Sequence, residues 1–424
     1  MKRLILSISS LLALCSLTAQ TTREETLSDL GRTGGVYYAY PEEVPALTPA
    51  PKGYKPVYVS HYGRHGSRYL ISDNDYNSVR RLLADARDKN ALTPLGLDVL
   101  ARIDSLMLET AGRGGDLSPL GVRQHKSIAA RMAKTYPQIF KSRNASLSAR
   151  STLVPRCILS MAAFCESLKE QNPSLSIDRE SSNRYMPYLC YHFPEHGKYT
   201  IDGKWKEQYR KFKTAHTNPD RLIASLFSDS AYVDININPS DLMWGLYWIA
   251  SDAQNTETSP SFYDIFTPDE LFDLWQSFNY VFYVNDGAFG GNGSLMTDNA
   301  HPLIENIVES ADKALASGKP TADLRFGHDG NLIPLAAALH LKDCDLVTSS
   351  PADFYKYFSD WKIAPMAGNI QIIFFRNEKN PKDILVKFLL NERETAIPLA
   401  TASFPYYPWE DVRDFLLKEI EGSR

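Results

Sequence analysis

A hydrophobic run meets a cluster of charges in the stretch Val57-Tyr58-Val59-Ser60-His61-Tyr62-Gly63-Arg64-His65-Gly66-Ser67-Arg68. Its first four residues are mostly β-branched or aromatic, which predicts a short buried strand over 57–60. The charged run 64–68 follows within four residues. Ligands of open α/β sheets bind where the carboxyl ends of the strands lie, so we expect this run at a binding edge.

Hydrophobic periodicity predicts strands and helices on either side of the middle of the chain. Before residue 170 it gives strands over 57–60 and 145–150, and helices over 75–89, from Ser118-Pro119 and from near Pro155. After residue 300 it gives helices over 301–316, from about 332 and over 409–420, and strands over 324–326, 369–376 and 384–390. This alternation predicts an α/β sheet with helices on its faces.

The middle of the chain, residues 170–300, has a different character. It shows little strand signal and many aromatic residues, among them Trp205, Trp244 and Trp275. Thr267-Pro268-Asp269-Glu270 is typical of a capped helix start. We therefore predict a mostly α-helical cap domain at 170–300, inserted into an α/β core made of 20–169 and 301–424.

The first residues are typical of an export signal. Lys2 and Arg3 precede an apolar run over 4–14, and Ala19 offers a small residue at a cleavage point. This predicts a signal peptide over 1–19 and a periplasmic or secreted protein. The alternative is a lipoprotein anchored at Cys15, which the bulky Leu14 disfavours. The rest of the sequence has no apolar run long enough to span a membrane.

Four cysteines remain after such a cleavage, in a compartment where disulfides form. Cys157 and Cys165 lie eight residues apart on one predicted helix. That spacing is about 12 Å along the helix axis, beyond the reach of a disulfide. Whether Cys190 or Cys344 takes part in a disulfide stays open.

Composition narrows the chemistry further. The 424 residues carry 46 basic and 50 acidic side chains, so no basic excess indicates a nucleic-acid partner. No CxxC pair or His/Cys cluster indicates a metal site. No GxSxG or GxxxxGK[ST] stretch indicates a serine hydrolase or a P-loop. We expect no metal and no organic cofactor.

Two arginines flank one histidine in the run 64–68. Guanidinium groups match phosphate oxygens in a bidentate way. Two neighbouring cations also lower the pKa of a histidine, which keeps the imidazole neutral and nucleophilic. The run therefore suits phosphoryl transfer through a phosphohistidine, and the simpler alternative is a basic surface loop.

Four ordered segments of the chain resemble the histidine acid phosphatases, a branch of the histidine phosphatase superfamily that includes phytases and multiple inositol polyphosphate phosphatases. The segments span about 270 residues and lie at Ser60–Tyr69, Leu117–Gln124, Arg156–Phe164 and Gly327–Leu332. The resemblance implies a phosphoglycerate-mutase-like sheet core with helices on both faces. It does not extend to residues 170–300.

The resemblance also implies a role for each matched residue. His65 would be the nucleophile, and Asp329 would protonate the leaving alkoxide and later activate water. Four further side chains would bind the transferred phosphate: Arg64, Arg68, Arg156 and His328. We expect a small phosphate ester as the partner, with no membrane association after signal cleavage.

The substrate class is less defined. His328-Asp329-Gly330 resembles the phytase and glucose-1-phosphatase form, whereas 64–69 is closer to the inositol polyphosphate branch. We expect an inositol phosphate such as phytate, with a sugar monophosphate or a broad acid phosphatase activity as the alternative. A phosphate-binding protein without catalysis is a third reading. Candidates for further substrate binding are Arg184, Lys204 and Lys206, and a solvated helix face is the alternative for the two lysines.

Overall fold

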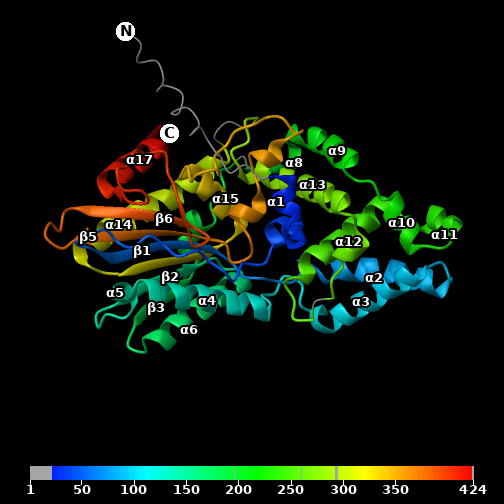
Figure 1. Ribbon diagram of the computed structural model, residues 1–424, viewed down its shortest axis with the longest axis horizontal. Coiled ribbons are helices and arrows are strands. Elements are labelled where there is room, and N and C mark those ends of the chain that lie inside the picture. The colour runs from blue at the N-terminus through cyan, green and yellow to red at the C-terminus, as the bar shows by residue number, and fades with distance from the viewer. Residues whose placement is uncertain (1–21, 195, 259, 292–294, 423–424) are drawn as a thin grey trace, which may run out of the picture.

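The computed structural model describes residues 22–194, 196–258, 260–291 and 295–422. The predicted signal peptide and Cys15 lie outside these ranges. A sheet with helices on both faces forms one end of the molecule, and a body of helices forms the other (Figure 1). The predicted α/β fold is confirmed. No helix in the described ranges is long and apolar enough to cross a membrane.

Eight strands form one mixed sheet in the order β3-β2-β4-β1-β5-β6-β7, with β8 paired to β6. The first four in this order are parallel, and β5 runs antiparallel to β1. The strands are β1 Tyr54–Arg64, β2 Ser146–Ser151, β3 Ser176–Ser181, β4 Ala322–Gly327, β5 Asn369–Asn377, β6 Ile384–Leu390, β7 Arg393–Thr395 and β8 Tyr407–Pro408.

Strand β1 is longer than the predicted 57–60. Its last residues are polar or small and carry no β pattern of their own. They remain extended because both neighbouring strands pair with them, Gly63 opposite Asn369 of β5 and Arg64 opposite Gly327 of β4. Pairing on two sides thus carries the strand up to the charged run.

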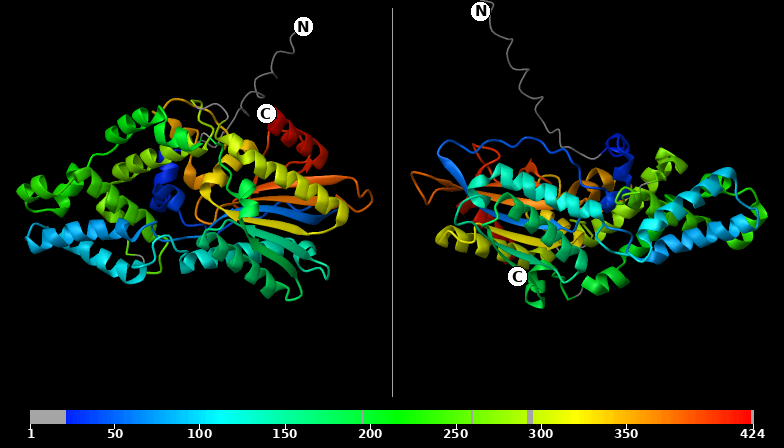
Figure 2. Two further views of the ribbon diagram at one scale, coloured as in Figure 1. Left: turned by 180° about the vertical axis from the view of Figure 1, so that it is seen from behind. Right: turned by 90° about the horizontal axis from the view of Figure 1, so that it is seen from below.

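Both faces of the sheet are covered, as Figures 1 and 2 show. Val59, Leu324 and Ile373 share one core with α4 (Pro119–Thr135), α5 (Pro137–Phe140) and α6 (Pro155–Gln171). On the opposite face, Tyr58 and Phe374 share a core with α14 (His301–Ser317), α15 (Asp329–Ala338) and α17 (Trp409–Gly422). Consecutive residues of a central strand therefore enter different cores.

The helical body has a core of its own. The helices that contribute to it are α2 (Asp73–Asp88), α3 (Pro94–Thr110), α10 (Asp220–Leu226), α12 (Pro239–Ala253) and α13 (Pro268–Asp286). Further helices of this end are α9 (Trp205–Ala215) and α11 (Ser230–Asn236). The N-terminal turn η1 (Leu30–Tyr37), which follows α1 (Arg23–Leu27), packs against α12 and α13.

Three elements lie apart from the predicted division of the chain at residue 170. Helices α2 and α3 precede that residue but pack in the helical body, whereas β3 follows it but pairs with β2 in the sheet. The division into 20–169, 170–300 and 301–424 stays a prediction. The four described cysteines, Cys157, Cys165, Cys190 and Cys344, are free thiols.

Candidate active site

The two histidines of the matched segments meet at one edge of the sheet. β1 and β4 are parallel neighbours, and each histidine is the first residue after its strand. The backbone N–H of His65 donates to the carbonyl of Gly327 at 3.0 Å. The imidazole rings of His65 and His328 lie 5.8 Å apart, centroid to centroid. The expected binding edge therefore brings together segments more than 250 residues apart in sequence.

The loop after His65 leaves no space for a larger residue at Gly66. A Cβ atom there would lie 2.5 Å from the carbonyl oxygen of Gly121 in the first turn of α4. The Gly66 N–H donates to the Ser160 hydroxyl of α6 at 3.1 Å. Ser118, the N-cap of α4, donates its backbone N–H to the Ser67 carbonyl at 2.9 Å. The loop is held against the N-terminus of one helix and the side of another.

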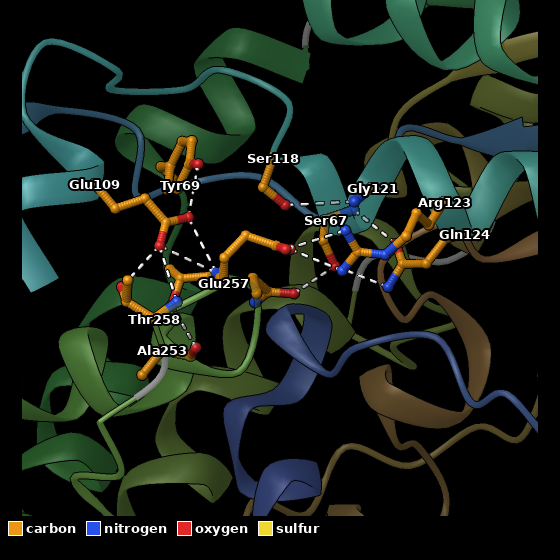
Figure 3. Close-up of polar contacts among 12 residues, drawn as sticks. Ser67, Tyr69, Glu109, Ser118, Gly121, Arg123, Gln124, Ala253, Glu257 and Thr258 are labelled. Carbon is orange, nitrogen blue, oxygen red and sulfur yellow. Dashed lines mark hydrogen bonds and ion pairs between the residues drawn. The ribbon is translucent and has the colours of Figure 1, made fainter.

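Ser67 is the centre of a buried polar network (Figure 3). Its N–H donates to Gln124 Oε1 and its hydroxyl accepts from Gln124 Nε2, both at 2.8 Å. The same hydroxyl donates to Asn255 Oδ1 at 2.6 Å, just beyond α12. One serine therefore connects the charged loop to α4 on one side and to the helical body on the other.

The segment after α12 is anchored by charges as well (Figure 3). Glu109 of α3 accepts hydrogen bonds from the backbone N–H groups of Glu257 and Thr258 and from the Tyr69 hydroxyl. Glu257 forms a two-pronged ion pair with Arg123 of α4, at 2.7 and 3.1 Å. These contacts fix the connection between the helical body and the charged loop.

Arg64 is completely buried. Its Nη1 donates to the carbonyls of Val36 and Ala364, the latter at 2.8 Å, and its Nη2 lies 2.7 Å from Asp329 Oδ2. Burial lowers the pKa of Arg64 to about 10, although Asp329 opposes this shift. Arg64 therefore stays a cation at physiological pH.

Arg68 and Arg156 complete a group of three cations. Arg68 is 6% exposed and donates through Nη1 to the Tyr69 carbonyl and the Tyr37 hydroxyl. Arg156 lies in the first turn of α6, as the sequence predicted. Among the described residues, no hydrogen-bond partner is found for the buried Nε atoms of Arg64, Arg68 and Arg156. Buried donors are normally satisfied, so three unused guanidinium N–H groups beside one another indicate an anion site.

His65 lies among these cations and is itself 2% exposed. Its Nδ1 is 2.9 Å from the Gly66 carbonyl, which assigns the proton to Nδ1 and leaves the lone pair on Nε2. Burial and then the charges of Arg64 and Arg68 hold the pKa of His65 well below its ordinary value. The imidazole is therefore neutral, as a nucleophile requires.

His328 and Asp329 stand at the N-terminus of α15, which begins three residues before its predicted start near 332. Thr152 Oγ1 lies 3.2 Å from His328 Nε2, and burial lowers the pKa of His328 to about 4. Burial alone would raise the pKa of Asp329, but Arg64 and His328 hold it below its ordinary value. Asp329 is thus ionised while it is paired with Arg64.

A second carboxyl group approaches this one. Asp286 ends α13, and its Oδ1 would lie 3.3 Å from a Cβ placed on Gly330. Burial and then the charge of Asp329 raise the pKa of Asp286 to about 8. No sequence motif contains this aspartate, because only folding brings the end of α13 to the start of α15.

The predicted phosphate-site residues Arg64, His65, Arg68, Arg156, His328 and Asp329 act on one another electrostatically at this edge. The other three candidates have different surroundings. Arg184 is exposed over the Tyr185 ring. Lys204 precedes α9, and Lys206 lies over the Trp205 ring. Their substrate contacts stay a prediction. Sequence reasoning missed Tyr37, Ser160 and Asn255, whose contacts with the loop are all long-range.

Comparisons with known proteins place the chain in a family. The model of the histidine phosphatase superfamily (branch 2) matches residues 63–391. No curated protein matches the chain in a sequence search. Among solved structures, the multiple inositol polyphosphate phosphatase of Bifidobacterium longum, in complex with inositol hexasulfate, is similar with a TM-score of 0.74 and 17% identity over 91% of this chain and 97% of the other.

Two phytases are also similar in structure. The phytase from D. castellii has a TM-score of 0.68 and 17% identity, covering 97% of this chain and 89% of the other. The Hafnia alvei phytase in complex with tartrate has a TM-score of 0.54 and 13% identity, covering 88% and 98%. At such identities the likeness shows a shared fold.

The position of His65 predicts an unusual titration. Because its pKa lies well below 6.5, its imidazole should stay neutral as the pH falls through 6.5, whereas His340, whose pKa is raised by its hydrogen bond to Asp345, should become protonated above 6.5. NMR titration of the imidazole protons, assigned with His65→Asn and His340→Asn, measures both. A His65 midpoint at or above 6.5 would show that burial and the neighbouring arginines do not lower its pKa.

Proposed function

Because the chain belongs to branch 2 of the histidine phosphatase superfamily, we propose that it is a phosphatase that hydrolyses inositol phosphates such as phytate through a phosphohistidine on His65. The observation that carries this proposal is the set of unused guanidinium N–H groups of Arg64, Arg68 and Arg156 around a neutral imidazole. His328 adds a fourth phosphate ligand.

The first step transfers the phosphoryl group to His65. Nε2 attacks phosphorus in line with the ester oxygen, the P–O bond breaks, and the carboxyl proton of Asp329 passes to the leaving alkoxide. The arginines neutralise charge on the equatorial oxygens, which is the main requirement of phosphoryl transfer. A well-placed acid accelerates departure of a poor leaving group by roughly 10²–10⁴-fold.

The second step returns the enzyme to its starting state. Water attacks phosphorus, the P–N bond breaks, and the Asp329 carboxylate takes the proton of the water. His65 then regains its lone pair on Nε2, and inorganic phosphate leaves.

Asp329 must be protonated when the ester binds, although Arg64 keeps its pKa low in the free site. A phosphate dianion that engages Arg64 competes with this ion pair and adds negative charge nearby, and both effects raise the pKa of Asp329. Lowering the pH also protonates Asp329, while His65 stays neutral because its own pKa is depressed. We therefore expect the best activity at acidic pH.

The substrate class rests on two observations. The similar Bifidobacterium longum enzyme is an inositol polyphosphate phosphatase in complex with inositol hexasulfate, and two further similar structures are phytases. Basic residues at Arg184, Lys204 and Lys206 would suit a substrate with several phosphates. The alternative, a sugar monophosphate, is favoured by the His328-Asp329 pair, which resembles the glucose-1-phosphatase form as much as the phytase form.

We also propose that the protein is exported and that its chain divides into a core and a cap as the sequence predicts. A signal peptide over 1–19 would deliver the enzyme to the periplasm or the medium. The segment 170–300 would act as a cap whose basic residues meet the substrate, over a core formed by 20–169 and 301–424.

A turnover panel tests the reaction and its substrate. The purified protein should release phosphate from phytate faster than from glucose 1-phosphate at pH 5, without effect of EDTA, and His65→Ala should abolish release from both. Phosphate release measures the rates. Near-normal turnover by His65→Ala would exclude the nucleophile, and faster turnover of glucose 1-phosphate would favour the sugar-phosphate alternative.

Asp329→Asn tests the proton donor. Asparagine cannot protonate an alkoxide, so kcat for glycerol 2-phosphate should fall by roughly 10²–10⁴-fold. For p-nitrophenyl phosphate, whose leaving group needs no proton, kcat should fall less than about tenfold. The two esters serve as controls for each other. Equal losses on both would mean that Asp329 does not act as the acid.

A further inference from the structure

The N-terminal segment 22–41, here called the arm, contains no residue of the matched motifs, yet it is tightly held beside the site. The Tyr247 hydroxyl of α12 donates to the Thr33 carbonyl at 2.6 Å. Gln254 accepts from the Ala39 N–H and donates to the Gly31 carbonyl, both at 3.1 Å. The arm is therefore fixed to the helical body along its length.

The arm is also tied to the sheet side of the site. Asp360 Oδ2 accepts the Val36 N–H at 3.2 Å, and the Val36 carbonyl accepts from Arg64 Nη1. The next residue, Tyr37, is 8% exposed. Its backbone carbonyl accepts a hydrogen bond from Asn255 Nδ2 at 2.9 Å. Consecutive residues of the arm thus reach Arg64 and the network around Ser67.

Tyr37 makes two contacts with Arg68. Its hydroxyl accepts a hydrogen bond from Arg68 Nη1 at 3.2 Å, and its ring centroid lies 4.7 Å from the guanidinium carbon. The ring is held on other sides by Trp248 and Phe278, each with its centroid at 6.2 Å. A rigid aromatic ring therefore supports the guanidinium through a cation–π contact and a hydrogen bond.

We propose that Tyr37 is a positioning residue that keeps the Arg68 guanidinium directed at the substrate phosphate. This inference rests on the proposed function, because it takes Arg68 to be a phosphate ligand. It adds to the site a segment that no motif contains, and it makes the arm a functional part of the phosphate pocket.

A competing partner for Arg68 gives Tyr37 this importance. Asp252 of α12 is completely buried; its Oδ2 accepts from the Tyr76 hydroxyl, and no hydrogen-bond partner is found for its Oδ1 among the described residues. Burial raises the pKa of Asp252 to about 7, so it offers Arg68 a hydrogen-bond acceptor at acidic pH and a negative charge at higher pH. An arginine side chain is long and has several rotatable bonds. Without Tyr37, we expect the Arg68 guanidinium to rotate toward the Asp252 carboxyl group. A turn of this kind would leave the phosphate with one cation fewer.

The test compares Tyr37→Phe, Tyr37→Leu and a matched control, Tyr40→Phe. Tyr40 lies in the same arm, is 6% exposed and donates its hydroxyl to Glu392 at 3.0 Å. Binding of inorganic phosphate by calorimetry, kcat and KM for p-nitrophenyl phosphate, and Tm are measured on all three and on the unsubstituted protein.

We expect Tyr37→Phe to raise the Kd of phosphate by about tenfold and Tyr37→Leu by about a hundredfold, from loss of the hydrogen bond and then of the ring. Tyr40→Phe should lower Tm by as much as Tyr37→Phe but change the Kd less than about twofold. If Tyr37→Phe binds phosphate more tightly than Tyr37→Leu, the aromatic ring itself positions Arg68. A general destabilisation of the arm would not produce this difference.

Two results would overturn the inference. In the first, the unsubstituted protein binds phosphate and hydrolyses p-nitrophenyl phosphate in a reaction that requires His65, but both Tyr37 variants have the same Kd and kcat as this protein. Tyr37 then has no positioning role, and the proposed function stands. If the unsubstituted protein neither binds phosphate nor hydrolyses p-nitrophenyl phosphate, the proposed function fails and the inference fails with it.

Discussion

The arrangement of this protein depends on three guanidinium groups around one uncharged imidazole, with those of Arg64 and Arg68 buried and that of Arg156 half-buried. Moving a cation out of water costs several kcal/mol unless partners replace the water. Arg64 receives two carbonyls and Asp329, and Arg68 receives a carbonyl, a hydroxyl and an aromatic ring. The compensation is incomplete, since each group keeps a buried Nε–H for which the described part of the chain provides no partner. A bound phosphate would accept hydrogen bonds from these N–H groups.

The partners of these cations come from every part of the fold. The sheet provides the strand ends after which His65 and His328 lie. Helices α4 and α6 hold the loop between Arg64 and Arg68, and the arm contacts the Arg68 guanidinium. The helical body joins this assembly through Asn255, beside α12. The helical body therefore also fixes the loop that follows His65.

Much of the fold follows from local patterns. β5 and β6 are strongly hydrophobic, β1 and β4 each contain a short hydrophobic run, and α4, α6 and α13 begin with proline in the first turn, so these elements could be located from their own residues. β3 could not, because Ser-Ile-Asp-Arg-Glu-Ser is polar and becomes a strand only by pairing with β2 at the edge of the sheet. Helix α3 could also be predicted, because Thr93-Pro94 is a helix start signal and Val99, Leu100, Ile103 and Leu106 recur at helical spacing.

The residues of the site also divide into those that the sequence predicts and those that only the structure reveals. The matched motifs brought forward Arg64, His65, Arg68, Arg156, His328 and Asp329, whose roles follow from a family pattern. Tyr37, Asn255 and Asp286 have no motif, and each reaches the site only through contacts between distant segments. Long-range packing of this kind leaves no periodic signal in the sequence, so only the structure could add these residues.

The central claim is that His65 receives the phosphoryl group. The most direct measurement is to mix the protein with radiolabelled p-nitrophenyl phosphate, quench in alkali within one turnover, and locate the label by peptide mapping. We expect an alkali-stable, acid-labile label on the peptide that contains His65, absent from His65→Ala. Label on another residue, or rapid turnover with no labelled peptide, would contradict it.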